Sequence, residues 1–244
     1  MMDETDIRAE KNWWQRKLGE KTIASLKRRN ICAEYVSDRH GALSKVLGLI
    51  AKDATVGWGD SVTLHQIGII TELEKTRRHS VLNAFRASTS REILALMRKA
   101  MTADVFITGV NAITLDGKLV SVDALGNRVA AMIFGPKRVI VVAGINKIVR
   151  NLDEAINRIK EVAIINARRH VVKHDIQSFG NLPCAKTGLC TDCFHPDRIC
   201  RYTVVIDGER EPSFASFEDG VELRAEESYT PRIHVIIVGE ELGI

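Results

Sequence analysis

Long apolar runs are missing from this sequence. None of the apolar stretches within its 244 residues approaches the length of a membrane-spanning helix. The N-terminal segment MMDETDIRAEKNWWQRKLGEK carries charges throughout and has no apolar centre, which excludes a secretory signal. We therefore expect a cytoplasmic protein without membrane insertion.

A strong charge of either sign is also missing. The formal net charge is +4, and Lys and Arg are scattered along the chain without a long basic run. Nucleic acid is therefore not an expected partner. A small anionic metabolite suits this mild positive balance better. No motif fixes the oligomeric state, and a homo-oligomer is compatible with the sequence.

The motifs of several enzyme classes are incomplete or missing. The turn Gly57-x-Gly59 lacks the third glycine of a dinucleotide fingerprint, because Val62 stands at that position, and no Walker lysine follows. No glutamate follows the segments DVFITG and RVIVVAG, where a CoA-transferase would carry its nucleophile. Redox chemistry by this chain would therefore depend on a metal centre or on a partner.

Buried strands are predicted in the middle of the chain. The segments DVFIT and RVIVVA are apolar and end at Gly109 and Gly144. Such continuous runs are typical of parallel strands that are covered on both faces. Between them, Asp116-Gly117 separates AIT from KLVSV, which predicts a two-residue hairpin with both turn residues at positive φ.

Apolar residues recur at helical spacing in three segments. These predict helices over residues 10–29, 42–50 and 152–169. Trp13 and Trp14, in the first helix, are interpreted as packing residues.

Helix starts are marked by polar capping pairs. Thr89 with Glu92, and Asn151 with Glu154, have the spacing of a capping box. Each pair predicts the first turn of a helix that follows it directly.

Repeated strand-loop-helix units predict an α/β fold. We expect a mainly parallel sheet with flanking helices in a single domain over residues 1–244. The apolar segment RIHVIIVG is expected to return into this sheet as its last strand. Residues 178–230, rich in proline, cysteine and charge, are predicted to form a cysteine-rich insertion before that strand. Within it, residues 208–227 are expected to form a loop or surface hairpin.

Polar residues after the strand ends predict a ligand crevice. In open α/β sheets, ligands bind beyond the carboxyl ends of the strands. The glycine turn after ATV leads into a helix that Asp60 or Ser61 would cap, which presents backbone N–H groups to an anion. A tight turn with a capping serine is an equally weighted structural alternative. The predicted ligand-binding residues are Gly57, Gly59, Ser61, Gly109, Asn111, Asn127, Arg128, Asn146 and Lys147.

No nucleophile is identified, and the catalytic candidates are charged side chains. Asp123 and Glu240 are carboxylates that would move protons, and Arg128 would stabilise negative charge. Asp123 has a structural alternative, in which it would hold its own loop together. Asp116, similarly, is interpreted as the residue that its hairpin turn demands. Lys147 has the alternative of a surface lysine at a helix start.

Four of the five cysteines lie close together, at Cys184, Cys190, Cys193 and Cys200. The Cys-x2-Cys pair places two thiolates on one turn, and the outer two can complete a four-sulfur shell. In a reducing compartment, such a cluster is more often a metal site than a pair of disulfides. We expect an iron–sulfur cluster of the 4Fe-4S type, because zinc sites favour two Cys-x2-Cys pairs. Zinc, or four cysteines without a metal, are the alternatives. His195 is a candidate for a substitute ligand, and its favoured alternative is a surface histidine held by the proline that follows it.

The fifth cysteine has a different setting. Cys32 stands alone beside an apolar residue. We interpret it as a small buried apolar side chain.

Several segments, in the same order, carry a family resemblance. They are VGWGDSVTL, ADVFITGVNAITLDGKLVSVDALGNRVAAMIFGPKRVIVVAGINKIV, EAINRIKEVA, PCAKTGLCTDC and IIVGEELG. Together they resemble the lactate-utilisation (LUD) domain family over nearly the whole chain. The resemblance implies a fold similar to the NagB/RpiA/CoA-transferase group. It also implies association with the oxidation of lactate to pyruvate, alongside iron–sulfur partner proteins.

Two functional interpretations stay open. In the first, the chain is an enzyme or a subunit of an L-lactate-oxidising iron–sulfur complex, acting on a small carboxylate or a phosphorylated metabolite. In the second, it is a non-catalytic metabolite-sensing or assembly subunit with a structural zinc site.

Overall fold

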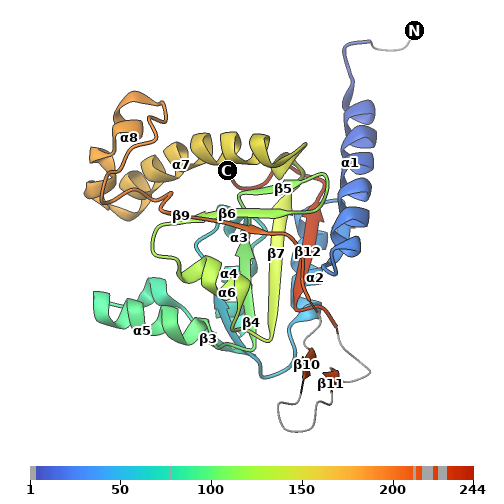
Figure 1. Cartoon of the computed structure of the whole chain (residues 1–244), viewed down its shortest axis with the longest axis horizontal. Coiled ribbons are helices and arrows are strands. Elements are labelled where there is room, and N and C mark those ends of the chain that lie inside the picture. The colour runs from blue at the N-terminus through green and yellow to red at the C-terminus, as the bar shows by residue number, and fades with distance from the viewer. Residues whose placement is uncertain (1–3, 77, 211–212, 216–221, 225–229) are drawn as a thin grey trace.

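The protein is built around one parallel sheet of six strands (Figure 1). The structure, a computed structural model, describes residues 4–76, 78–210, 213–215, 222–224 and 230–244. Every pairing within the main sheet is parallel. In spatial order the strands are β1 (Cys32–Val36), β12 (Ile233–Val238), β7 (Arg138–Gly144), β4 (Val105–Gly109), β2 (Thr55–Trp58) and β3 (Ser80–Leu82). The predicted α/β fold class is confirmed, and RIHVIIVG does return into the sheet, between β1 and β7.

A second sheet of four strands was not predicted. Its strands, in spatial order, are β8 (Ile148–Val149), β5 (Ala112–Thr114), β6 (Leu119–Asp123) and β9 (Tyr202–Ile206). Strand β9 lies within residues 178–230, where the sequence predicted an insertion, and it pairs antiparallel with β6. The chain therefore returns to the domain directly after the last cysteine.

Helices cover both sheets. They are α1 (Arg8–Arg28), α2 (Arg39–Leu49), α3 (Val62–Gln66), α4 (Ile69–Thr76), α5 (Ser90–Ala100), α6 (Asn127–Ile133), α7 (Leu152–His174) and α8 (Pro183–Thr187). Short 3-10 turns are η1 (Ala84–Arg86), η2 (Ile145–Lys147) and η3 (Gln177–Asn181). We call residues 177–201 the cysteine arm; it lies at the far end of α7 (Figure 1).

Part of the predicted surface hairpin is present. Strands β10 (Ser213–Ala215) and β11 (Glu222–Arg224) pair antiparallel. The residues that join them, and those that flank them at 211–212 and 225–229, lie outside the described part of the chain.

The core is layered because the main strands are apolar on both faces. On one face, Val56, Ile107 and Ile236 pack with Leu64 and Ile69 of α3 and α4. The other face packs against α1, α6 and the second sheet, with Val141 and Phe106 among its residues. Helix α7 covers the outer face of the second sheet. These layers place the carboxyl ends of β2, β4 and β7 beneath α7.

The hairpin at Asp116-Gly117 is present, but its turn differs from the prediction. Only Gly117 has a positive φ, of 92°. The Gly117 N–H donates to the Thr114 carbonyl at 2.8 Å, and the Thr114 N–H donates to the Lys118 carbonyl at 3.0 Å. The loop is therefore a three-residue type I turn followed by a glycine bulge, which needs one left-handed residue and not two.

Trp13 and Trp14 do not pack in the core, contrary to the prediction. Their side chains are 64% and 57% exposed. Helix α1 extends beyond the body of the protein, and only its second half contacts the sheet (Figure 1). The buried residues of this helix are Gly19, Thr22, Ser25 and Leu26. Cys32 also differs from the prediction, because it is half-buried.

Both predicted capping pairs are confirmed. The Glu92 N–H donates to Thr89 Oγ1 at 3.2 Å, and the Glu154 N–H donates to Asn151 Oδ1 at 2.9 Å. These bonds satisfy backbone donors at the helix starts that no carbonyl reaches. Helix α7 then continues five residues beyond the predicted end at Arg169, to His174.

Candidate functional site

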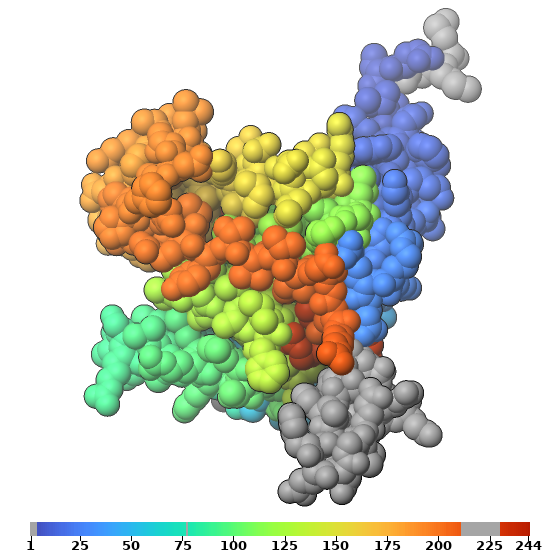
Figure 2. All heavy atoms as spheres, in the orientation of Figure 1, coloured from blue at the N-terminus to red at the C-terminus, as the bar shows by residue number. Residues whose placement is uncertain are grey.

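A cavity of about 920 Å³ lies where the predicted crevice was expected. Its floor is formed by the loops after β2, β4 and β6, and its walls by α5, the second half of α7 and the cysteine arm. Figure 2 shows the surface hollowed between the orange arm and the teal helix α5. The predicted residues that line it are Gly59, Ser61, Gly109, Asn111, Asp123, Asn127, Arg128 and Lys147.

Three predicted residues lie elsewhere. Gly57 packs beneath α5, where an added Cβ would fall 2.7 Å from Ala100 Cβ. The Asn146 side chain accepts a hydrogen bond from the Leu242 N–H at 3.1 Å. The carboxylate of Glu240 is paired with Arg39, at 2.7 Å. None of the three is among the residues that line the cavity.

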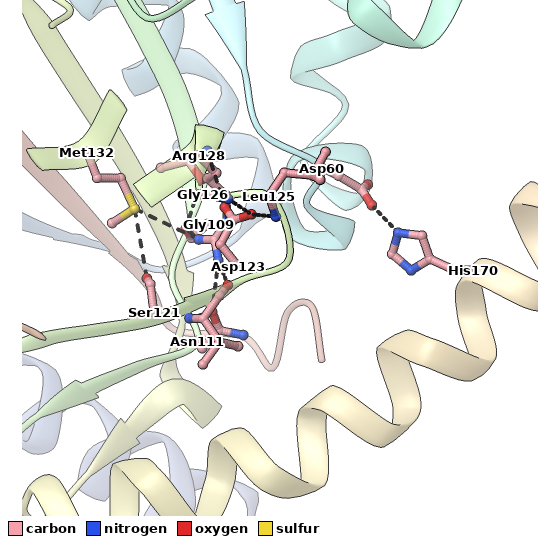
Figure 3. Close-up of polar contacts among 12 residues, drawn as sticks. Asp60, Gly109, Asn111, Ser121, Asp123, Leu125, Gly126, Arg128, Met132 and His170 are labelled. Carbon is pink, nitrogen blue, oxygen red and sulfur yellow. Dashed lines mark hydrogen bonds and ion pairs between the residues drawn. The ribbon is translucent and has the colours of Figure 1, made fainter. Parts of the chain in front are cut away.

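Arg128 ties the strand ends together (Figure 3). Its guanidinium donates to the Gly109 carbonyl at 3.1 Å, to Asn111 Oδ1 at 3.0 Å and to the Val122 carbonyl. Burial lowers the pKa of Arg128, while the charges of Asp123 and Asp60 oppose that effect. Because Gly109 belongs to β4 and Val122 to β6, these hydrogen bonds hold the two strands together.

Asp123 organises the loop after β6 (Figure 3). Its Oδ1 accepts hydrogen bonds from the Leu125 and Gly126 N–H groups, at 3.1 and 3.0 Å. Its Oδ2 accepts one from the Arg128 N–H at 3.2 Å. These are free donors at the start of α6, so the carboxylate caps that helix and fixes the position of Arg128.

Asp60 joins the loop after β2 to α7. Its carboxylate accepts two hydrogen bonds from the Arg169 guanidinium, one of them at 2.9 Å. His170 Nε2 lies 3.3 Å from Asp60 Oδ2 (Figure 3). The His170 Nδ1–H donates to the Asn166 carbonyl. Burial raises the pKa of Asp60, but the hydrogen bond with His170 and the charge of Arg169 outweigh it and lower that pKa.

The predicted caps at the start of α3 are not formed. Ser61 occupies the N-cap position but accepts no hydrogen bond there through its side chain. The Ser61 hydroxyl instead lies over Gly109, where an added Cβ would fall 2.5 Å from Ser61 Oγ. The predicted helix is also divided into α3 and α4 around Gly68, which has a φ of 78°.

Lys147 is buried at the base of the cavity, and it is not a surface lysine. It follows β7 in η2 and is 5% exposed. Its Nζ donates to Thr63 Oγ1 at 3.0 Å, and no carboxylate of the described residues pairs with it. Burial lowers the pKa of Lys147 to about 7, and the charges of Arg158 and Arg128 act in the same direction. Such a strong perturbation beside a cavity is typical of functional groups.

Helix α7 and the cysteine arm supply residues that sequence reasoning missed. Asn166, His170 and His174 are spaced four apart, so they share one face of α7 and line the cavity with Arg169. This spacing of four residues could have been used to predict the face of α7 from the sequence. Arg198 and Arg201, from the arm, line the cavity as well.

The charge of the cavity lining is positive. Five Lys and Arg residues and three Asp residues line it, and this excess of basic residues favours the binding of an anion. The five are Arg128, Lys147, Arg169, Arg198 and Arg201, and the three are Asp60, Asp123 and Asp197. Because Arg128 and Arg169 are paired with two of the carboxylates, the excess rests on Lys147 and the arm.

All four clustered cysteines line a second, smaller cavity of about 190 Å³ between α7 and the arm. Their thiols lie close enough to affect one another: burial raises the pKa of Cys184, and Cys193 and Cys200 raise it further. In kind, four thiols suit an iron–sulfur cluster or zinc. Among the described residues, however, no group of three or more His, Cys, Asp or Glu side chains is arranged to hold a metal ion.

His195 is not among the residues that line the small cavity. Its Nδ1 accepts a hydrogen bond from the Asp197 N–H at 3.2 Å. Arg198 lines both cavities and donates to the Cys193 carbonyl at 2.7 Å. The arm therefore links the thiols to the wall of the larger cavity.

Membrane insertion has no support in the helices that the structure describes, since none is both long and apolar enough to cross a bilayer.

Comparison with solved structures identifies several distant similarities. The chain is similar to a DUF162 family protein from Deinococcus radiodurans, with 10% identity and a TM-score of 0.45, over 92% of this chain and 97% of that one. It is also similar to eIF2B beta from Chaetomium thermophilum (13% identity, TM-score 0.26, 56% of this chain and 44% of that one). A third similarity is to ribose 5-phosphate isomerase from Plasmodium falciparum (16% identity, TM-score 0.24, 55% and 54%).

Comparison of the sequence is more decisive. No curated protein matches the chain. The family profile described as the LUD domain matches residues 19–213, which include both sheets except for β12 and the β10–β11 hairpin beyond Ser213. Because that match covers most of the 244 residues, the protein belongs to the LUD domain family.

Proposed function

We propose that this LUD domain protein serves lactate utilisation by binding a small anionic metabolite in the large cavity. Family membership supports the association with lactate utilisation. The observation that carries the binding proposal is the buried amine of Lys147, which has no carboxylate partner among the described residues.

A bound carboxylate would offset the cost of charging this amine. An ammonium group that is buried without a counter-ion is strongly disfavoured. A carboxylate beside Lys147 Nζ would restore the ammonium form and accept its remaining hydrogen bonds. The Ser61 hydroxyl, which lies close to Gly109 in the same part of the cavity, is a further donor.

Binding should be measured by isothermal titration calorimetry with L-lactate and with pyruvate. We expect Lys147→Met to weaken the binding at least tenfold, because it removes the only cation at the base that no carboxylate of the described residues neutralises. Lys52→Met is the matched control, since Lys52 is exposed and precedes the start of β2, whereas the cavity lining follows the end of that strand. Equal affinities for wild type and Lys147→Met would contradict the proposal.

We further propose that Cys184, Cys190, Cys193 and Cys200 hold an iron–sulfur cluster, of the 4Fe-4S type. Two observations support this: the four cysteines line one cavity, and four thiolates are the usual ligands of such a cluster. Binding would require the four thiolates to converge, and the small cavity between them leaves room for that. When bound, such a cluster supplies one-electron transfer.

The cluster is tested by anaerobic purification, followed by absorption spectroscopy and analysis for iron, sulfide and zinc. We expect iron and sulfide in wild type and in Cys32→Ser, whose substituted residue lies outside the arm, and neither in Cys184→Ser. A colourless protein with one equivalent of zinc would replace this proposal by the structural zinc site.

Electron transfer would require a partner protein with iron–sulfur centres of its own. The cysteine arm offers a contact surface, because Leu189 is 71% and Phe194 91% exposed beside the thiols. Reduced thiols also suit the cytoplasmic location that we infer for the protein.

A further inference from the structure

The surroundings of Lys147 suit an amine that reacts. Its Nζ is held by the Thr63 hydroxyl at 3.0 Å, and it lies at the cavity wall. Two glycines leave space around it. A Cβ at Gly109 would fall 3.6 Å from Lys147 Nζ, and one at Gly243 would fall 2.8 Å from it. The amine is therefore buried, but Gly109 and Gly243 place no side chain over it.

We propose that Lys147 forms an imine with the carbonyl carbon of an anionic oxo acid bound in the cavity. This rests on the proposed function, because the oxo acid must occupy the same anion-binding cavity. It adds a covalent step and restricts the ligand class to compounds that carry a carbonyl group.

The state of the amine supports this chemistry. With a pKa of about 7, a large fraction of Lys147 carries a free electron pair at neutral pH. An ordinary lysine is almost entirely protonated there and does not attack carbonyls efficiently. Burial without a nearby anion is an established way to activate a lysine.

The step balances without an oxidant or reductant. The nitrogen electron pair attacks the carbonyl carbon, the C–N bond forms, and the carbonyl oxygen takes up a proton. Nitrogen then loses its protons, and the oxygen leaves as water while the C=N bond forms. The Thr63 hydroxyl touches Nζ and is placed to pass a proton between nitrogen and oxygen. In this step the carboxylate of the oxo acid lies toward Arg198 and Arg201, on the arm, so that Lys147 faces the carbonyl group and not the carboxylate.

The imine is tested by borohydride trapping. Wild-type protein is incubated with pyruvate and sodium borohydride, digested and mapped by mass spectrometry. We expect one saturable adduct on the peptide that contains Lys147, and none on the peptide that contains Lys52. L-lactate, which has the same carbon skeleton and charge but no carbonyl, should give no adduct.

A second variant separates this inference from the binding proposal. Lys147→Arg keeps the positive charge, so we expect it to bind pyruvate in calorimetry within about fivefold of wild type while giving no adduct. Binding of pyruvate by wild type without an adduct at Lys147 would overturn the imine and leave the proposed function intact. If wild type binds neither pyruvate nor lactate, both the imine and the proposed function are overturned.

Discussion

Arg169 on α7 and Asp60 after β2 form a two-point ion pair between residues that lie 109 positions apart in the chain. Their side chains are only 15% and 21% exposed. The pair connects the helix that carries the cysteine arm to the floor of the large cavity. It therefore holds the α7 wall of that cavity against its floor.

Replacement of Asp60 should weaken this connection. We expect Asp60→Asn to lower the free energy of unfolding by about 2 kcal/mol, because Arg169 would lose its charged acceptor in a partly buried setting. Urea denaturation measures the change. Asp6→Asn is the matched control, since Asp6 also pairs with an arginine, Arg8, but at an exposed site, and it should leave the free energy of unfolding unchanged within the error of the measurement.

The effect of Asp60→Asn on the free energy of unfolding should depend on pH. The folded-state pKa of Asp60 is lowered, so its contribution to stability is present above the unfolded pKa of about 3.9 and is lost as the pH falls through the folded value. The stability difference between wild type and Asp60→Asn should therefore narrow below about pH 4. A difference that stays constant to the lowest pH at which the protein folds would refute this explanation.

Lys147 should make the stability of the protein rise with pH. Its pKa is about 7 in the folded state, below the usual value of about 10.4. Between these values the unfolded chain binds the additional proton, so the free energy of unfolding rises with pH, by up to about 1.4 kcal/mol per unit. We expect Lys147→Met to lose this rise between pH 7.5 and 9.5 in urea denaturation, and Lys52→Met to retain it. Parallel curves for wild type and Lys147→Met would count against a buried neutral amine.

Gly57 should matter for packing and not for ligand binding. An added methyl group would fall 2.7 Å from Ala100 Cβ, so Gly57→Ala should cost about 1–3 kcal/mol of stability. Gly48, in α2, has no neighbour within 4 Å of an added Cβ, and Gly48→Ala should instead stabilise the protein by about 0.5–1 kcal/mol. Thermal unfolding distinguishes the two. A loss of pyruvate affinity in folded Gly57→Ala would argue for a direct role in the site.

Asp123 should act as a structural cap and not as a proton carrier. Asp123→Ala removes an acceptor for three backbone N–H groups, and we expect a loss of about 2 kcal/mol in the free energy of unfolding. Asp123→Asn keeps one side-chain oxygen and should lose less than half as much. Borohydride trapping by Asp123→Asn should proceed as in wild type; an abolished adduct in a fully stable variant would instead assign Asp123 to the chemistry.

Local patterns predicted the parts of the fold that local physics determines. The strands before Gly109 and Gly144 were predicted because their residues are apolar on both faces. Thr89 and Asn151 were predicted as caps because each acts within one helical turn. The position of the large cavity followed from the rule that strand ends of a parallel sheet share one edge.

Contacts between distant segments were not predictable in this way. The pairing of Asp60 with Arg169 depends on where α7 crosses the domain, which no short pattern encodes. For Lys147 the sequence left two interpretations open, a ligand-binding residue and a surface lysine at a helix start, because a short turn does not by itself determine burial. Its side chain is buried among segments far from it in the sequence, since its Nζ contacts Thr63 and lies close to Gly243.

The position of β12 determines when the main sheet can be completed during translation. This strand lies between β1 and β7, and among the strands that the structure describes it is the only neighbour of β1. Until residues 233–238 have left the ribosome, β1 stays unpaired and β7 has one bare edge. Both edges are open to wrong partners during that interval, so the nascent chain is most exposed to mispairing until β12 has been made.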